Sequence, residues 1–194
     1  MIRWSTALER AAIVVISFLV AIGAIVLLSG FFSSRDQGGV SGVLSGPGLV
    51  YKDLGDATLK PGQRHPAYDS APPTSGAHFA APVRSDASVL DVNQILTALA
   101  AGDVILMYGG PKPPPGLAAL ATSTSGGSFS PALAEAGEAV ILARLPGING
   151  IEALSWTRIL PITGLVRLTA RDDALLKQFV DAWLGRGATG TGNN

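Results

Sequence analysis

The longest apolar run of the chain lies near its N-terminus, over residues 11–32. The run contains no charged residue and no proline, and a helix rising about 1.5 Å per residue over this length spans the roughly 30 Å hydrocarbon core of a bilayer. A cleaved signal peptide is the alternative, but its apolar region is about 7–15 residues long and is followed by small residues. This run is longer and ends in Phe31 and Phe32. We therefore predict one uncleaved transmembrane helix.

Charges on the two sides of this run predict its orientation. Arg3 and Arg10 precede it, whereas the residues just after it offer only Arg35 beside Asp36. Positively charged flanks stay on the cytoplasmic side of a membrane. We expect residues 1–10 in the cytoplasm and the rest of the protein on the outer side.

Small residues interrupt the bulky apolar run at three nearby positions, Ala21, Gly23 and Ala24. Such positions allow a neighbouring helix to approach closely. We expect the anchor to pack against integral membrane protein subunits within the lipid bilayer.

Composition divides the remaining chain into a tether, one domain and a tail. Residues 33–48 are rich in Ser and Gly, which is typical of a flexible tether. The Gly- and Thr-rich composition of residues 186–194 predicts a disordered tail. Residues 49–185 between them suffice for a single domain with a modest core.

Hydrophobic periodicity predicts that strands and helices alternate in this domain. The predicted strands cover 49–54, 104–108, 138–145 and 152–162, and the predicted helices cover 90–101, 117–121 and a last segment capped by Thr169. The turn-forming residues 146–150 predict that the last two strands pair as a hairpin. A Pro-rich stretch over 55–88 has neither period, and such long loops are often functional.

Two of the predicted helices have clear ends. Ser88 or Asp91 can cap the first helix, and Gly102 can end it. The last helix places acidic residues in its first turn, where the helix dipole favours them. Its expected core stripe consists of Leu175, Leu176, Phe179, Val180 and Trp183.

The order of these elements predicts an α+β domain with a small mixed sheet. The order β-α-β-α-β-β-α is compatible with a thioredoxin-like arrangement. The chain has no cysteine, which excludes disulfides, thiolate metal ligands and the dithiol chemistry of that fold. Lys and Arg number 14 and so do Asp and Glu, so no basic field favours nucleic-acid binding.

The most distinctive stretch of the chain reads HPAYDSAPPTSGAHF over residues 65–79. Its candidate partner or ligand residues are His65, Tyr68, Pro72, Pro73, Thr74, Ser75, Gly76 and His78. Prolines fix φ and Gly permits positive φ, which predicts a rigid loop. The loop either presents His78, with His65, to a metal or partner, or is a braced loop whose histidines bond to carbonyls; we favour the second interpretation.

This stretch resembles the signature of an uncharacterised bacterial membrane-anchored family, a domain of unknown function with a His and a Tyr followed by Pro-Pro-Thr-Ser-Gly-x-His. The resemblance extends more loosely over about residues 60–185. It implies a location in the bacterial inner membrane, with the domain in the periplasm or extracellular space.

The chain departs from that family on the helix after the signature. Members carry His-x-Leu-Glu-His-Gly there, whereas residues 97–102 read TALAAG. The resemblance therefore implies a fold kept without the family's polar site. With only two histidines in the chain, we predict no metal and no cofactor.

These observations predict a non-catalytic accessory or scaffold subunit of a multi-subunit membrane complex, respiratory or photosynthetic, that docks through its outer domain. We identify no catalytic residues, since neither a nucleophile motif nor a phosphate-binding loop is present. The alternative is a domain that binds a metal or small ligand through the Pro-Pro-Thr-Ser-Gly-Ala-His loop.

Overall fold

A computed structural model divides the chain into two units, Met1–Leu44 and Ser45–Asn194. It describes residues 46–164 and 168–188, all within the second unit. The predicted transmembrane helix at 11–32, the small residues at 21, 23 and 24 and most of the tether lie outside the described residues. Within the described ranges, no helix is both long and apolar enough to cross a bilayer.

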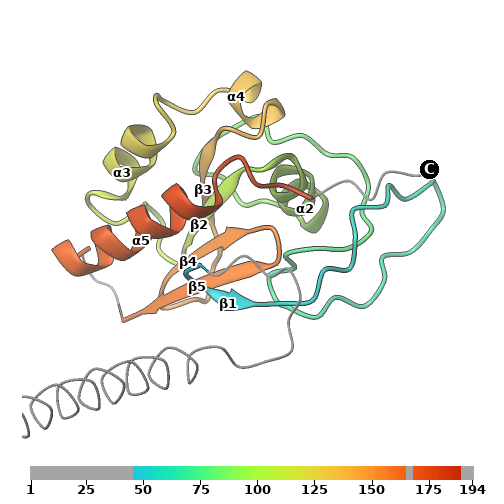
Figure 1. The fold of residues 1–194 in the computed structure, drawn as a ribbon, viewed down its shortest axis with the longest axis horizontal. Helices are drawn as coiled ribbons and strands as arrows, with labels where there is room; N and C mark the ends of the chain where they lie inside the picture. Colours follow the sequence, from blue (N-terminus) through green and yellow to red (C-terminus); the bar gives the residue numbers. More distant parts are fainter. Residues whose placement is uncertain (1–45, 165–167, 189–194) are drawn as a thin grey trace, which may run out of the picture. The chain divides into compact units, whose positions relative to one another are not determined.

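The described part of the domain contains strands and helices on one mixed sheet (Figure 1). In chain order they are β1 (Leu49–Val50), α2 (Val92–Ala101), β2 (Val104–Tyr108), α3 (Leu117–Thr124), α4 (Pro131–Glu135), β3 (Val140–Arg144), β4 (Gly150–Ser155), β5 (Arg158–Thr163) and α5 (Ala170–Trp183). The predicted α+β class with a mixed sheet is confirmed.

The sheet has the strand order β1-β5-β4-β2-β3. Among the described strands, only β2 and β3 run parallel, with Val104 opposite Val140, while the other neighbours are antiparallel. The predicted hairpin of 138–145 with 152–162 is therefore wrong. The segment 152–162 itself forms the hairpin β4–β5, and β3 instead pairs with β2 after a crossover that contains α3 and α4.

Other boundaries also differ from the sequence-based expectations. The strand expected over 49–54 is only two residues long, and α4 was not predicted at all. The helix expected over 90–101 is confirmed as α2, with Asp91 as its cap. The last helix begins after Thr169 as expected and buries Leu176, Phe179, Val180 and Trp183, while Leu175 is half-buried.

The core consists of two apolar layers, one on each face of the sheet. Residues of β2 alternate between them, with Ile105 and Met107 facing α2 and Val104, Leu106 and Tyr108 facing α3 and α5. All five β2 residues are buried, as is typical of a strand covered on both faces. Figure 1 shows α2 on one side of β2 and α5 with α3 on the other.

The sheet edge at β3 is covered by the segment 86–88. The Asp86 carboxylate accepts a hydrogen bond from the Leu142 N–H at 2.8 Å, and the Arg144 N–H donates to the Ser88 carbonyl at 2.7 Å. A covered edge cannot pair with another chain. At the opposite edge, Leu49 and Val50 of β1 are 56% and 55% exposed.

Both ends of the described chain pack onto the domain. The Trp183 indole N–H donates to the Pro47 carbonyl at 2.9 Å. The Ala188 N–H, within the segment predicted as a tail, donates to the Ala100 carbonyl at 3.0 Å.

Candidate functional site

Residues 65–78, here called the signature loop, lie against the preceding segment 52–58. The Gly76 N–H donates to the Gly55 carbonyl at 2.7 Å, and the His78 N–H donates to the Ala57 carbonyl at 3.1 Å. Gly76 has a φ of 126°, and a Cβ there would lie 2.8 Å from the Tyr68 ring. Glycine is therefore required both by the backbone conformation and by the packing of Tyr68.

The hydroxyl groups of the signature loop are buried and bonded within the domain. Ser75 Oγ accepts from the Leu54 N–H at 3.0 Å and donates to the Lys52 carbonyl at 2.9 Å. The Thr74 carbonyl accepts from the Thr157 N–H at 3.1 Å, which joins the loop to the β4–β5 turn. Thr74 and Ser75 are both fully buried.

The aromatic residues of the loop also bond to carbonyls. His78 is 6% exposed, and its Nδ1 lies 2.9 Å from the carbonyl oxygen of Gly76, so Nδ1 carries the proton. The Tyr68 hydroxyl donates to the Ala77 carbonyl at 2.9 Å. Burial raises the pKa of Tyr68, which keeps this donor protonated.

His65 is exposed to solvent, unlike the buried His78. Its Nε2 is 2.8 Å from the side-chain oxygen of Asn93 on α2, and its ring meets Phe79 edge to face at 5.5 Å. The described residues contain no group of three or more His, Cys, Asp or Glu side chains placed to hold a metal ion. The structure thus places the predicted residues together in one loop, in which Ser75, Tyr68 and His78 bond to backbone groups of the domain while His65 is exposed.

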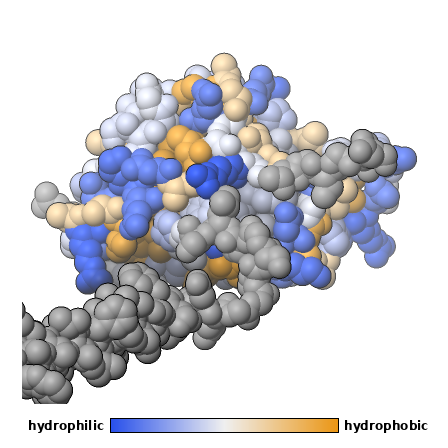
Figure 2. Space-filling view, viewed as in Figure 1, coloured by the Kyte–Doolittle hydropathy of each residue, from blue (hydrophilic) through white to orange (hydrophobic). Residues whose placement is uncertain are grey.

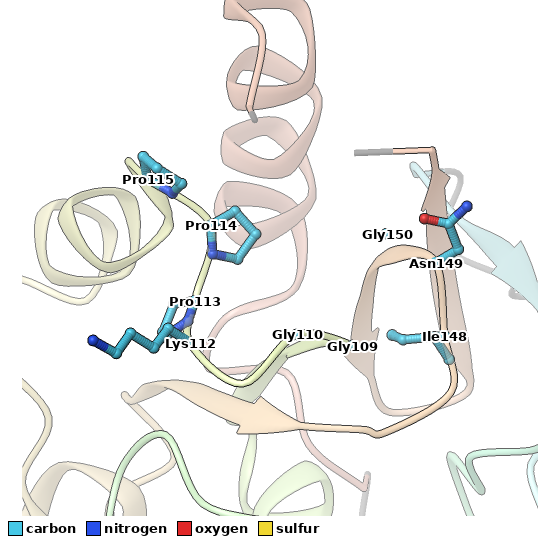
Figure 3. A pocket seen from close by; sticks show the side chains of 9 residues that line it. All are labelled: Gly109, Gly110, Lys112, Pro113, Pro114, Pro115, Ile148, Asn149 and Gly150. Carbon is cyan, nitrogen blue, oxygen red and sulfur yellow. The ribbon is translucent and has the colours of Figure 1, made fainter. Parts of the chain in front are cut away.

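A second candidate site lies where the loop 109–115 leaves β2. This loop and Ile148–Gly150 together line a cavity of about 430 Å³. In Figure 3 the Lys112 side chain extends away from Ile148 and Asn149, so its ammonium group does not bridge the two walls. Glycine and proline make up most of the lining, which also includes Lys112.

The walls of this cavity are fixed by close backbone contacts. A Cβ at Gly109 would lie 1.9 Å from the Ile148 carbonyl oxygen, so only glycine allows the two loops to meet. The Arg144 guanidinium donates from Nε to the Gly110 carbonyl at 3.2 Å. The loop is therefore held to the end of β3.

A third candidate, which sequence reasoning missed, is the carboxyl group of Asp103. This side chain is 1% exposed. Its Oδ1 accepts from the Ala139 N–H at 2.9 Å, but its Oδ2 has no hydrogen-bond partner within the described part of the chain. Burial raises the pKa of Asp103 to about 7, although the Ala139 hydrogen bond lowers it.

Asp103 lines a cavity of about 180 Å³ at the C-terminal end of α2. Its lining also includes Thr97 and Ala101. The sequence signal was an acidic residue directly before an apolar strand, a position from which a side chain can enter the core.

Comparison with known proteins gave no match to a protein-family model, to a curated protein or to a solved structure.

Proposed function

We propose that this protein is a non-catalytic accessory subunit of a multi-subunit membrane complex, held by an N-terminal anchor and docking through its outer domain. The observation that carries the proposal is the internal bonding of the signature loop. Ser75, His78 and Tyr68 direct their polar groups to carbonyls and amides of the same domain. The loop is thus built as a brace that stiffens the domain.

A stiff domain is well suited to docking, because rigid loops lose little conformational entropy when a partner covers them. The Pro-rich loop 109–115 and the signature loop both have this character. Figure 2 shows small apolar areas separated by polar residues on the visible face, a mixture typical of non-obligate interfaces.

We propose that the docking surface lies at β1 and that a neighbouring membrane subunit binds there. Leu49 and Val50 are large apolar residues with more than half of their surface exposed, and they follow the predicted tether directly. A subunit in the same membrane is the partner that such a tether brings close. We propose a respiratory or photosynthetic assembly as its setting.

The family assignment and the thioredoxin-like arrangement remain part of this proposal. The observed element order, β-α-β-α-α-β-β-β-α, differs from the predicted order β-α-β-α-β-β-α, and β1 adds a fifth strand at one edge. The strand order β3-β2-β4-β5 with one parallel pair still supports a thioredoxin-like sheet. A fold alone does not carry a function, and the chain has no cysteine for redox chemistry.

Binding of a metal or small ligand through the signature loop is the second candidate. Its support is the exposed imidazole of His65. Elemental analysis of purified protein and of a His65→Ala variant separates the two functions. One tightly held metal per chain, lost in the variant, would favour the ligand-binding function.

The docking proposal is tested by solubilising the membrane in mild detergent. We expect the full chain in a large particle of fixed stoichiometry, and we expect Val50→Asp to release it. Val89→Asp is the matched control, because Val89 is also an exposed valine, 60% exposed, beside the segment that covers the opposite sheet edge. A monodisperse monomer with a turnover of its own would overturn the proposal.

A further inference from the structure

Residues 60–64, here called the basic turn, lie in the long loop between β1 and α2. The Gln63 N–H donates to the Lys60 carbonyl at 3.0 Å, and the Lys60 N–H donates to the Gln63 side-chain oxygen at 2.6 Å. Pro61 and Gly62 occupy the two central positions, and Gly62 has a φ of 88°, as a type II turn requires. In Figure 1 the blue-green chain that follows β1 runs out beyond the sheet.

Both arms of the basic turn are bonded to the rest of the domain. Before the turn, the Leu59 N–H donates to the His78 carbonyl at 2.8 Å. After the turn, His65 Nε2 lies 2.8 Å from Asn93 Oδ1 on α2, an oxygen that also accepts from the Phe79 N–H at 3.0 Å. A partner that covers the turn therefore has little backbone entropy to remove.

The basic turn carries positive charge without a counter-charge. The residues from 60 to 67 are all exposed, and Lys60 and Arg64 are cations in a stretch, 57–68, that contains no acidic residue. Within the described ranges the only salt bridge lies on α5, so neither cation of the turn is ion-paired there. The chain as a whole has no net charge, which makes this turn a local separation of charge.

Two cations on a fixed turn match the carboxylates of a protein better than a membrane surface. Anionic lipids are bound by clusters of about 4–8 Lys and Arg residues, and the sequence 60–67 contains no large apolar side chain to enter the bilayer interface. Nucleic acids require a wider basic surface than two side chains provide. A guanidinium group, by contrast, can bind one carboxylate through two parallel hydrogen bonds.

We propose that the basic turn binds an acidic segment of the neighbouring membrane subunit, with carboxylates of that segment on Lys60 and Arg64. This inference rests on the proposed docking function and adds a charged contact to the apolar one at β1. Leu49 and Val50 contribute apolar area, whereas complementary charges at an interface mainly raise the association rate and exclude wrong partners. The two surfaces therefore have different roles and can be tested separately.

The test is carbodiimide cross-linking of the full chain within the detergent-solubilised particle. The reagent joins an amine and a carboxylate in contact as an amide, and it takes up the water that is released. We expect mass spectrometry to find Lys60 joined to an Asp or Glu of another polypeptide. Lys177 and Asp181, 2.8 Å apart on α5, should be joined within the chain, which shows that the reagent has acted. Lys60→Arg keeps the charge without the amine, so it should retain the particle and lose the cross-link.

A double substitution measures what the charges contribute. Lys60→Gln with Arg64→Gln should lower the fraction of the chain that stays in the particle by about threefold at about 0.15 M salt. Arg171→Gln with Lys177→Gln removes the same charge from exposed positions on α5 and should leave that fraction unchanged. Circular dichroism should be unaltered in both, because all four side chains are exposed.

The outcomes separate this inference from the proposed function. A particle without a cross-link from Lys60 to another chain, or one that the two double variants affect equally, overturns the inference and leaves the proposed function standing. Absence of the particle overturns both. The full chain reconstituted alone into vesicles containing phosphatidylglycerol completes the test: protection of Lys60 from acetylation there would show that the turn binds lipid, and the inference would be wrong.

Discussion

Ser75 joins the signature loop to the segment before it through two hydrogen bonds of one hydroxyl group. Replacing it with alanine leaves the Leu54 N–H and the Lys52 carbonyl without this partner in a part-buried place. We expect Ser75→Ala to lower the free energy of unfolding by about 2 kcal/mol. Urea denaturation of the full chain measures this change.

Ser128→Ala is the matched control for that substitution. Ser128 is exposed between α3 and α4, so its replacement should change the free energy of unfolding by less than about 0.5 kcal/mol. Equal effects of the two substitutions would show that the signature loop does not brace the domain.

Because of Asp103, the free energy of unfolding falls as pH rises, whereas an ion-paired carboxylate makes it rise with pH. Its pKa is raised from 3.8 to about 7 by burial, so the folded state holds a proton that the unfolded state has already released. This contribution is fully present below about pH 4, falls as pH rises to about 7, and is lost above that. At about 1.4 kcal/mol per pKa unit the loss is about 4 kcal/mol.

Asp103→Asn should remove this dependence, because the amide oxygen can still accept from the Ala139 N–H but does not ionise. We expect the variant to gain stability over the wild type between pH 4 and pH 7, as measured by urea denaturation at each pH. Glu152, whose pKa burial also raises, is common to both proteins and cancels in the difference. A constant difference over this range would contradict the assigned pKa.

The positive φ of Gly76 in the signature loop was predictable from its residues, but the Asp103 cavity was not. Proline, threonine and glycine have local conformational preferences that a sequence displays. The burial of Asp103 instead depends on α4, on Val83 and on the Ala139 N–H, which meet it only in the folded domain. The spacing of these residues along the sequence does not indicate that they are in contact.

At the scale of elements, the β4–β5 hairpin shows why strand pairing was assigned wrongly. Its two-residue turn, Trp156-Thr157, has no Gly, Pro, Asn or Asp, and Thr157 adopts a φ of 59°. The sequence therefore looks like one strand over 152–162.

The helix α4 has a recognisable start in the sequence, because Ser130 caps it and Pro131 is its first residue. It was not predicted because a helix of five residues is too short to show a hydrophobic period.

Thr169 controls the start of α5 through a capping box with Asp172. The Thr169 hydroxyl and N–H both bond to the Asp172 carboxylate and lower its pKa. We expect Thr169→Ala to destabilise the domain by about 1 kcal/mol and to return the pKa of Asp172 toward its ordinary value. Urea denaturation and NMR titration measure the two effects.

Thr122→Ala is the control for this helix cap. Thr122 is exposed within α3, where alanine has the higher helix propensity. This substitution should not destabilise the protein. An equal loss of unfolding free energy in both variants would mean that the Thr169 cap does not specifically stabilise the domain.

At the scale of the whole molecule, the predicted anchor makes a topological prediction. Arg3 and Arg10 precede the apolar run 11–32, so we expect the domain outside the cytoplasmic membrane. Protease added to intact spheroplasts should remove the domain, while a cytoplasmic marker protein stays intact. Full protection of the domain would contradict the predicted orientation.

The first and last described segments of the domain hold each other in place. Trp183 donates to the Pro47 carbonyl across 136 sequence positions, and a Cβ at Gly46 would lie 2.4 Å from the Trp183 ring. Among the described strands, β1 pairs with β5 alone. Translation therefore produces Leu49 and Val50 long before the strand and helix that receive them. Domains of long chains commonly begin to fold from the N-terminus during synthesis. The strand β1 cannot pair in this way, because its partner strand is made only when nearly the whole domain has been synthesised.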